Sequence, residues 1–293
     1  MQIADFGREL RNLPLASEAK RLKTGINAWA FPPNLSLPQC FKLARRAGFD
    51  GIELALSEDG PVSLLSTEKD LAAIRSSAET ISLQVCSLAS GLGWKYPLTS
   101  EDTAIAQRGK EIIGAGLQVA AWLGVDVMLV VPGVVTKEVP YDAAYERAFD
   151  AIKELAPTAE KLGVSIGIEN VWSRFLLSPL EMRDFIDGIG SPAVCAYFDA
   201  GNVLVNGFPE HWISILGKRI RKVHVKDFKT AIGNIQGFAN VLQGDLDWIG
   251  VRNALRDVGY DDYVIAEVPG YKTLPDLGVR HCGEAMKRVF SRA

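Results

Sequence analysis

The sequence predicts a single closed (β/α)8 barrel that follows a short N-terminal extension. Three observations lead to this prediction. Eight apolar runs alternate along the chain with segments of helical pattern. The runs are rich in Val, Ile and Leu with little polar alternation, as expected of parallel strands that are buried on both faces. Several helical segments also end in the same way, with a glycine shortly before the next run, which is typical of a repeated βα unit.

The predicted strands begin after residue 23, so that residues 1–23 form the extension and residues 24–293 the barrel. The strands are expected at residues 24–30, 51–56, 83–88, 125–131, 164–169, 194–199, 220–226 and 263–267. No linker-like or low-complexity stretch interrupts them, which favours one domain. An open, doubly wound sheet is the alternative, because the number of strands alone does not exclude it.

Helical segments fill the intervals between these strands, and their ends carry capping signals. A Thr67-x-x-Asp70 capping box opens the second helix, and Ser178-Pro-Leu-Glu181 opens the fifth. Gly48, Gly124, Gly163 and Gly259 stand where helices end. The helices are expected at residues 37–47, 67–79, 101–123, 141–162, 178–186, 209–216, 248–258 and 277–290.

The composition excludes several classes of partner. The net charge is −3 and the pI about 5.8, so no basic excess points to nucleic acid or to an anionic membrane. The chain lacks a run of about 20 apolar residues that could span a bilayer, and its N-terminus has no apolar leader. Four scattered cysteines, without a CxxC pair, suit a reducing compartment. We therefore expect a cytoplasmic protein.

Side chains that can bind a metal stand at the ends of the last four predicted strands. Glu169 ends the fifth strand, Asp199 the sixth, His224 lies near the end of the seventh, and Glu267 ends the eighth. In a parallel barrel these ends converge on one mouth, where such barrels carry out chemistry. Three carboxylates and one imidazole suit a divalent cation that accepts oxygen and nitrogen ligands. The sequence thus predicts a metal centre, with Mn²⁺ as the expected ion and Mg²⁺ or Co²⁺ as rivals.

Three motifs, in this order, resemble the xylose-isomerase-like sugar phosphate isomerase/epimerase superfamily. They are Tyr197-Phe-Asp-Ala-Gly-Asn202, His224-Val-Lys-Asp227 and Ala266-Glu-Val-Pro269. Phe49-Asp-Gly-Ile-Glu53 and the segment 237–248 also match, so the resemblance covers roughly residues 24–290. It does not choose among the members, which include ketose 3-epimerases, hydroxypyruvate isomerases, inosose dehydratases and endonuclease IV.

The resemblance implies a reaction and roles for the strand-end residues. In the 3-epimerases the metal ligands are Glu, Asp, His and Glu, which Glu169, Asp199, His224 and Glu267 match in type and order. The two glutamates also act as acid and base, so Glu169 and Glu267 become the catalytic pair for proton abstraction next to a ketone, through a metal-stabilised enediolate. A sugar or sugar phosphate is the implied substrate, and a homo-oligomer the implied assembly.

One departure argues against a free ketohexose as the substrate. Epimerases of free ketoses carry a glutamate shortly after the fifth-strand ligand, and it binds substrate hydroxyls. The corresponding segment here is Asn170-Val-Trp-Ser-Arg-Phe175, which contains no acid. Other side chains of this segment must therefore shape that side of the pocket.

Five further residues are predicted to bind substrate, each with an alternative role. Glu53 could instead orient a neighbouring group or cap a turn, and Trp29 could belong to the core. Lys226 and Asp227 could simply pair at the strand end. Arg174 could hold a substrate phosphate or be a solvated loop charge.

Three other functions compete with an isomerase or epimerase. A keto-polyol (inosose-type) dehydratase would use the same metal and the same first proton abstraction, and then expel a hydroxyl. A DNA repair nuclease of the endonuclease IV type needs more histidines than the three present, and Asn202 stands where that nuclease has a histidine. A non-catalytic sugar-binding barrel would not lose any turnover on chelation.

Overall fold

The computed structural model describes residues 21–290, so the predicted extension, residues 1–23, lies almost wholly outside the described residues. Within this range eight parallel strands close into a barrel in the order β1-β10-β7-β6-β5-β4-β3-β2. Closure confirms the predicted (β/α)8 barrel and excludes the open sheet. The barrel strands are β1 (Lys23–Asn27), β2 (Gly51–Leu56), β3 (Gln84–Ser90), β4 (Val127–Val130), β5 (Ser165–Glu169), β6 (Val194–Asp199), β7 (Ile220–Val225) and β10 (Tyr263–Ala266).

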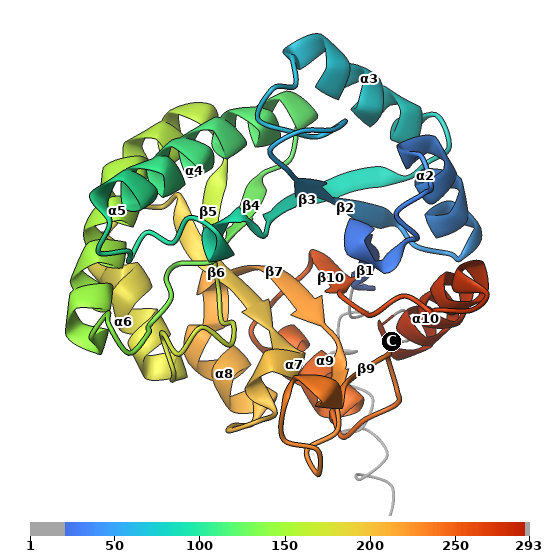
Figure 1. The fold of residues 1–293 in the computed structure, drawn as a ribbon. Coiled ribbons are helices and arrows are strands. Elements are labelled where there is room, and N and C mark those ends of the chain that lie inside the picture. Colours follow the sequence, from blue (N-terminus) through green and yellow to red (C-terminus); the bar gives the residue numbers. More distant parts are fainter. Residues whose placement is uncertain (1–20, 291–293) are drawn as a thin grey trace, which may run out of the picture.

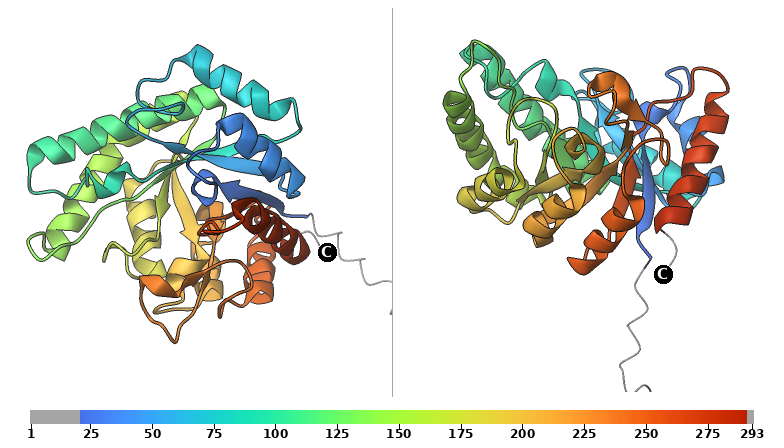
Figure 2. Two further views of the ribbon diagram at one scale, coloured as in Figure 1. Left: turned by 45° about the vertical axis from the view of Figure 1, so that its right-hand side comes forward. Right: turned by 90° about the horizontal axis from the view of Figure 1, so that it is seen from below.

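Helices form a ring around the strands, and the last helix packs against the first helix and strand of the described chain to complete it (Figures 1 and 2). The helices of this ring are α2 (Leu37–Arg46), α3 (Glu68–Glu79), α4 (Thr103–Leu123), α5 (Tyr141–Leu162), α6 (Pro179–Ile189), α8 (Pro209–Leu216), α9 (Trp248–Asp257) and α10 (Pro275–Phe290). The predicted caps are present: the side chains of Thr67 and Ser178 accept hydrogen bonds from the first turns of α3 and α6.

The apolar residues form two layers, as the barrel requires. One layer fills the space between strands and helices, and a smaller one fills the interior of the barrel, where Val127, Leu129, Tyr197 and Ile265 pack together. Glycine is needed where this interior is tightest. A Cβ atom at Gly51 would lie 2.6 Å from the ring of Tyr263. The two layers hold the strand ends, and hence the polar side chains there, in fixed positions.

The structure differs from the prediction mainly where short elements follow the strands. β1 ends at Asn27, because the Asn27 side chain accepts a hydrogen bond from the backbone N–H of Trp29 (2.7 Å) and turns the chain into a 3-10 helix, η1 (Ala28–Ala30). The short helix α7 (Ala200–Val203) and the antiparallel pair β8 (Asp227–Phe228) and β9 (Phe238–Ala239) were not predicted. These elements lie after β6 and β7, at the mouth of the barrel (Figure 1).

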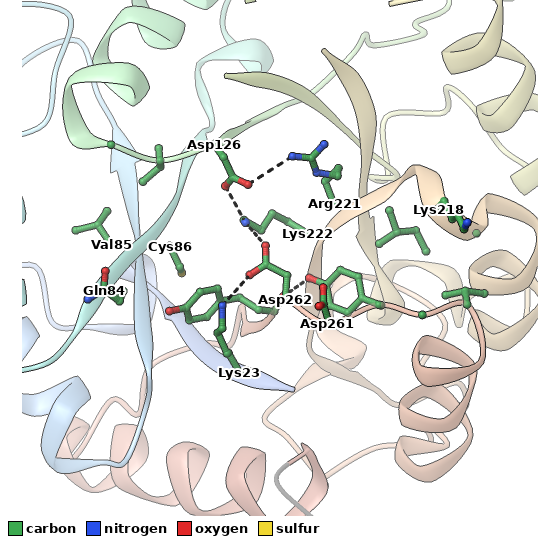
Figure 3. Close-up of a pocket in the computed structure, with 18 residues that line it drawn as sticks. Lys23, Gln84, Val85, Cys86, Asp126, Lys218, Arg221, Lys222, Asp261 and Asp262 are labelled. Carbon is green, nitrogen blue, oxygen red and sulfur yellow. Dashed lines mark hydrogen bonds and ion pairs between the residues drawn. The ribbon is translucent and has the colours of Figure 1, made fainter. Parts of the chain in front are cut away.

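A cavity of about 940 Å³ lies at the opposite, amino-terminal face of the barrel (Figure 3). Its centre is an ion cluster, in which the buried Lys222 ammonium donates to Asp126 Oδ1 (2.9 Å) and to Asp262. The two carboxylates offset the buried charge of Lys222, so we assign this cluster a structural role. None of the predicted metal ligands lines this cavity. No described helix combines the length and the apolar composition needed to cross a membrane.

Candidate metal centre

The four predicted metal ligands converge at the mouth of the barrel. One donor atom from each of Glu169, Asp199, His224 and Glu267 lies within 4.8 Å of the others. The strands account for this: Glu169 and Asp199 are the last residues of β5 and β6, His224 is paired with Asp199 across β6 and β7, and Glu267 directly follows β10. Three of the side chains are buried and that of Glu267 is 24% exposed, so the cluster opens to solvent past Glu267.

The imidazole of His224 is placed as a metal ligand would be. Its Nδ1 atom lies 3.5 Å from Glu169 Oε1, 3.7 Å from Glu267 Oε2 and 4.0 Å from Asp199 Oδ2. This atom is buried and has no hydrogen-bond partner among the described residues. A buried ring nitrogen without a partner, facing three carboxylate oxygens, fits a site for a divalent cation.

Glu53 holds the other side of that ring. Its Oε1 atom lies 2.6 Å from His224 Nε2, and the carboxylate also accepts hydrogen bonds from Asn27 Nδ2 (2.5 Å), Ser87 Oγ (2.6 Å) and the Tyr197 hydroxyl. Glu53 is fully buried, and β2 lies three strands from β7 around the barrel, so it reaches His224 across the interior. This contact fits the alternative in which Glu53 orients a neighbouring group, and binding of substrate by Glu53 stays a prediction. A carboxylate that binds Nε2–H leaves Nδ1 available to a metal.

Burial and charge perturb both partners of this pair. Burial alone would lower the pKa of His224, but the Glu53 and Glu267 carboxylates hold it well above its usual range. Burial alone would raise the pKa of Glu53, but His224 and the hydrogen bonds from Ser87 and Tyr197 hold it below its usual range. The two groups thus favour each other's charged form, and a cation at Nδ1 would displace a proton.

The acids on the other side of the centre crowd one another. Burial raises the pKa of Glu169 to about 7, and the nearby Glu267 carboxylate adds to this rise. Burial also raises the pKa of Asp199, while the pKa of Glu267 is lowered, because Lys226 and His224 outweigh its own burial. Buried carboxylates that disfavour each other's ionisation form a site that a cation stabilises.

Lys226 projects into this centre. Its ammonium donates to Asp199 Oδ2 and to Glu267 Oε2 (2.5 Å), and it lies 5.2 Å from the centre of the Phe238 ring. Lys226 thus pairs with Asp199 and Glu267 rather than with Asp227, and its contact with substrate stays a prediction.

Asp227 is buried and holds the segment after β8 in place. It accepts hydrogen bonds from the backbone N–H of Phe228 (2.9 Å) and Leu246 (3.0 Å) and from Trp248 Nε1 (3.0 Å). These contacts join both ends of the loop that contains β9. Because its carboxylate binds three protein donors, Asp227 anchors this loop at the mouth.

The remaining predicted residues lie farther out. Trp29 is 48% exposed on η1, and its ring lies beside Gly91 at the end of β3. Arg174 is exposed, adopts a left-handed backbone conformation (φ 60°) and lines a separate cavity of about 320 Å³ between the β5–α6 loop and α7. The structure does not bring Arg174 into the cluster of metal ligands.

Two asparagines near the site, Asn170 in the segment expected to shape one side of the pocket and Asn202 in the motif 197–202, have a role that the sequence did not predict. The side chain of Asn170 accepts from the backbone N–H of Asp199 and donates to its carbonyl oxygen (both 2.8 Å). The Asn202 backbone N–H donates to Asp199 Oδ1 (2.8 Å), and its side chain donates to the Asn170 carbonyl oxygen (3.0 Å). Together they fix the end of β6 beside β5. The signals available in the sequence were that Asn170 directly follows Glu169 and that Asn202 ends the motif 197–202, three residues after Asp199.

The chain is similar in sequence to a known family of barrels and to curated epimerases. A family model described as the xylose isomerase-like TIM barrel matches residues 41–288. The putative L-ribulose-5-phosphate 3-epimerase SgbU of Escherichia coli (strain K12) is 24% identical over 258 residues, which cover 83% of this chain and 87% of that protein. The L-ribulose-5-phosphate 3-epimerase UlaE of Salmonella typhi is 27% identical over 249 residues, which cover 83% and 85%.

Solved structures of epimerases share the fold. A D-psicose 3-epimerase in the presence of D-fructose superposes with a TM-score of 0.76 at 20% identity and covers 92% of this chain and 100% of that one. An L-ribulose 3-epimerase superposes with a TM-score of 0.77 at 19% identity, with coverage of 92% and 94%.

Proposed function

Since this chain belongs to the xylose isomerase-like TIM barrel family, we propose that it is a divalent-metal-dependent epimerase of a ketose or ketose phosphate. The observation that carries the proposal is the convergence of Glu169, Asp199, Glu267 and the unpartnered His224 Nδ1 within one cluster. These four side chains would hold the metal, with Mn²⁺ as the expected ion.

The two glutamates would transfer the protons. A divalent cation bound at this cluster would polarise the ketone of the substrate and stabilise negative charge on its oxygen. β5 and β10 are separated around the barrel by β6 and β7, so Glu169 and Glu267 approach the centre from different sides. One glutamate removes the proton from the carbon next to the ketone and the other returns a proton to the opposite face of the resulting enediolate. Inversion of that carbon is the outcome.

A phosphorylated ketose is the preferred substrate class. The curated relatives at 24% and 27% identity are described as L-ribulose-5-phosphate 3-epimerases. The segment 170–175 also lacks the acid that free-ketose epimerases carry after the fifth-strand ligand. A pentulose 5-phosphate is therefore the first substrate to test.

Glu→Gln substitutions at each of the two glutamates test the mechanism. Glutamine keeps a carbonyl oxygen that can bind metal but cannot accept the substrate proton, so net epimerisation should fall by about 10²–10⁴-fold. In deuterated water, the Glu267→Gln variant should still exchange the proton of one epimer, because the first base differs between the two directions. The exposed Glu154 of α5, which pairs with Lys110, provides a Glu→Gln control with unchanged turnover.

Two outcomes would redirect the proposal. A Glu267→Gln enzyme with bound metal and near-normal turnover would contradict the mechanism of two carboxylates. Release of water from a keto-polyol, without epimer formation from any ketose phosphate, would assign the same metal centre to a dehydratase.

A further inference from the structure

Lys226 uses two of the oxygens that the metal would need. Its ammonium contacts Asp199 Oδ2 and Glu267 Oε2, and these are the oxygens that lie 4.0 and 3.7 Å from His224 Nδ1. A cation bound by His224 and these two acids would lie between the same atoms. Metal–oxygen bonds are about 2.0–2.2 Å, shorter than ammonium–oxygen contacts, so the two cations would be close neighbours.

The neighbours of Lys226 restrict how its side chain can move away from the two carboxylates. A Cβ atom at Gly201 of α7 would lie 2.5 Å from Lys226 Cγ and 2.6 Å from the Lys226 carbonyl oxygen, so the first part of the side chain is held tightly against α7. The Phe238 ring lies 5.2 Å from Nζ. Only the end of the side chain is left to move, and the face of an aromatic ring is a favourable neighbour for an ammonium that leaves the carboxylates.

The charges of the centre fit one further cation. The charges of Glu53 and His224 offset each other, and the three ligand carboxylates exceed the single ammonium of Lys226 by two negative charges, which one divalent ion would neutralise. Lys226 therefore reduces the repulsion between the acids, but it does not remove the preference of the site for a divalent ion. Because the Lys226 ammonium contacts two of the ligand carboxylates, it competes with that ion for them.

We propose that Lys226 is an internal competitor for the metal: its ammonium holds Asp199 and Glu267 until a divalent cation binds, and it then moves off these carboxylates along Phe238. This inference rests on the metal centre of the proposed function and adds a residue that sets metal affinity. The lysine lowers the affinity below what the four ligands alone would give, and it stabilises the ligand cluster before the metal arrives.

The Lys226→Met variant tests the proposal by metal binding and by stability, without an activity assay. Mn²⁺ affinity is measured by isothermal titration calorimetry, and thermal unfolding is followed with and without Mn²⁺. We expect binding to be tighter by roughly tenfold or more, the scale at which one neighbouring charge acts at a buried site. We also expect a lower Tm without metal and a larger rise in Tm on adding Mn²⁺.

Lys222→Met is the matched control. Lys222, in β7, is also a buried lysine that bridges two acids, Asp126 and Asp262, but it lies at the other end of the barrel. Its loss should lower the Tm with and without Mn²⁺ alike and leave Mn²⁺ affinity unchanged. Lys226→Gln, which keeps a donor but no charge, should tighten binding as Lys226→Met does, and it decides the question if the Met variant does not fold.

The results separate this inference from the proposed function. If the neutral variants at Lys226 bind Mn²⁺ equally or more weakly than the wild type, Lys226 is not a competitor. If neither the wild type nor the variants bind Mn²⁺, Mg²⁺ or Co²⁺, the metal-dependent function itself is wrong. A Lys226→Met variant that folds only with Mn²⁺ would support the proposal, because the acids then depend on a cation.

Discussion

Replacing Glu53 by glutamine should weaken metal binding without disrupting the fold. Glutamine has nearly the same volume, and its carbonyl oxygen can still accept from Asn27 and His224. Its amide group can donate to Ser87 and Tyr197, whose hydroxyls accept as well as donate. The hydrogen-bond network therefore survives, and what is lost is the negative charge that orients the His224 ring and favours a metal at Nδ1.

The expected loss follows from the role of Glu53 as a partner of a metal-binding histidine. Removing such a carboxylate costs about 10- to 100-fold in metal affinity, or about 1.4–2.8 kcal/mol. The Glu53→Ala variant should be worse, because four donors lose a buried acceptor. The free energy of unfolding should then fall by about 3–5 kcal/mol, as is usual when one partner of a buried charged pair is removed.

Calorimetric titration with Mn²⁺ and thermal unfolding of the same samples measure both effects. The Glu154→Gln variant, at an exposed position of α5, is the control and should match the wild type. A Glu53→Gln protein with wild-type Mn²⁺ affinity would refute the orienting role. If that protein also had a raised KM for substrate, the original prediction of a substrate contact would be favoured instead.

Two further variants test the elements around the site. Asp227→Ala leaves three buried N–H donors without their acceptor, so the free energy of unfolding in urea should fall by about 2–4 kcal/mol. Lys222→Met removes the cation that, against the effect of burial, holds the pKa of Asp126 below its ordinary value of 3.8. This stabilisation is present above about pH 4 and is lost as the pH falls through the lowered pKa of Asp126, so the stability difference from the wild type should be largest near pH 7 and should shrink steadily as the pH falls below 4. A difference that did not depend on pH would contradict this account.

The barrel and the clustering of its candidate metal ligands could be predicted because their signals are local. Each of Glu169, Asp199 and Glu267 comes at the end of an apolar run, and parallel strands of a closed barrel bring such ends together. The structure places all four ligands within one cluster, with no long-range information needed beyond the closure of the sheet.

The roles of the other site residues depend on contacts that the sequence does not show. Glu53 acts on His224, which is 171 residues away and on the far side of the barrel. Asp227 binds the backbone N–H of Leu246, in the loop before α9, and the ring N–H of Trp248, the first residue of α9, and no sequence pattern predicts the path of that loop. The contact of Lys226 with Glu267 arises only once β7 and β10 are neighbours.

Short elements escaped prediction for a different reason. β8 and β9 have two residues each and α7 has four, which is too short for a strand or helix period to be recognised. At Trp29 the apolar character continued through residue 30, but the Asn27 side chain ends the strand by capping the next turn. Local hydrogen bonding there outweighed the hydrophobic pattern.

Proton exchange with solvent tests the central claim most directly. The Mn²⁺-loaded and the EDTA-treated protein are each incubated with L-ribulose 5-phosphate in deuterated water, and the products are followed by NMR. The loaded protein should form the 3-epimer with one deuterium at the carbon next to the ketone, and the chelated protein should form neither. Epimer formed without deuterium, or at the same rate after the metal is removed, would contradict a metal-dependent mechanism in which one of Glu169 and Glu267 removes the substrate proton and the other donates a new one.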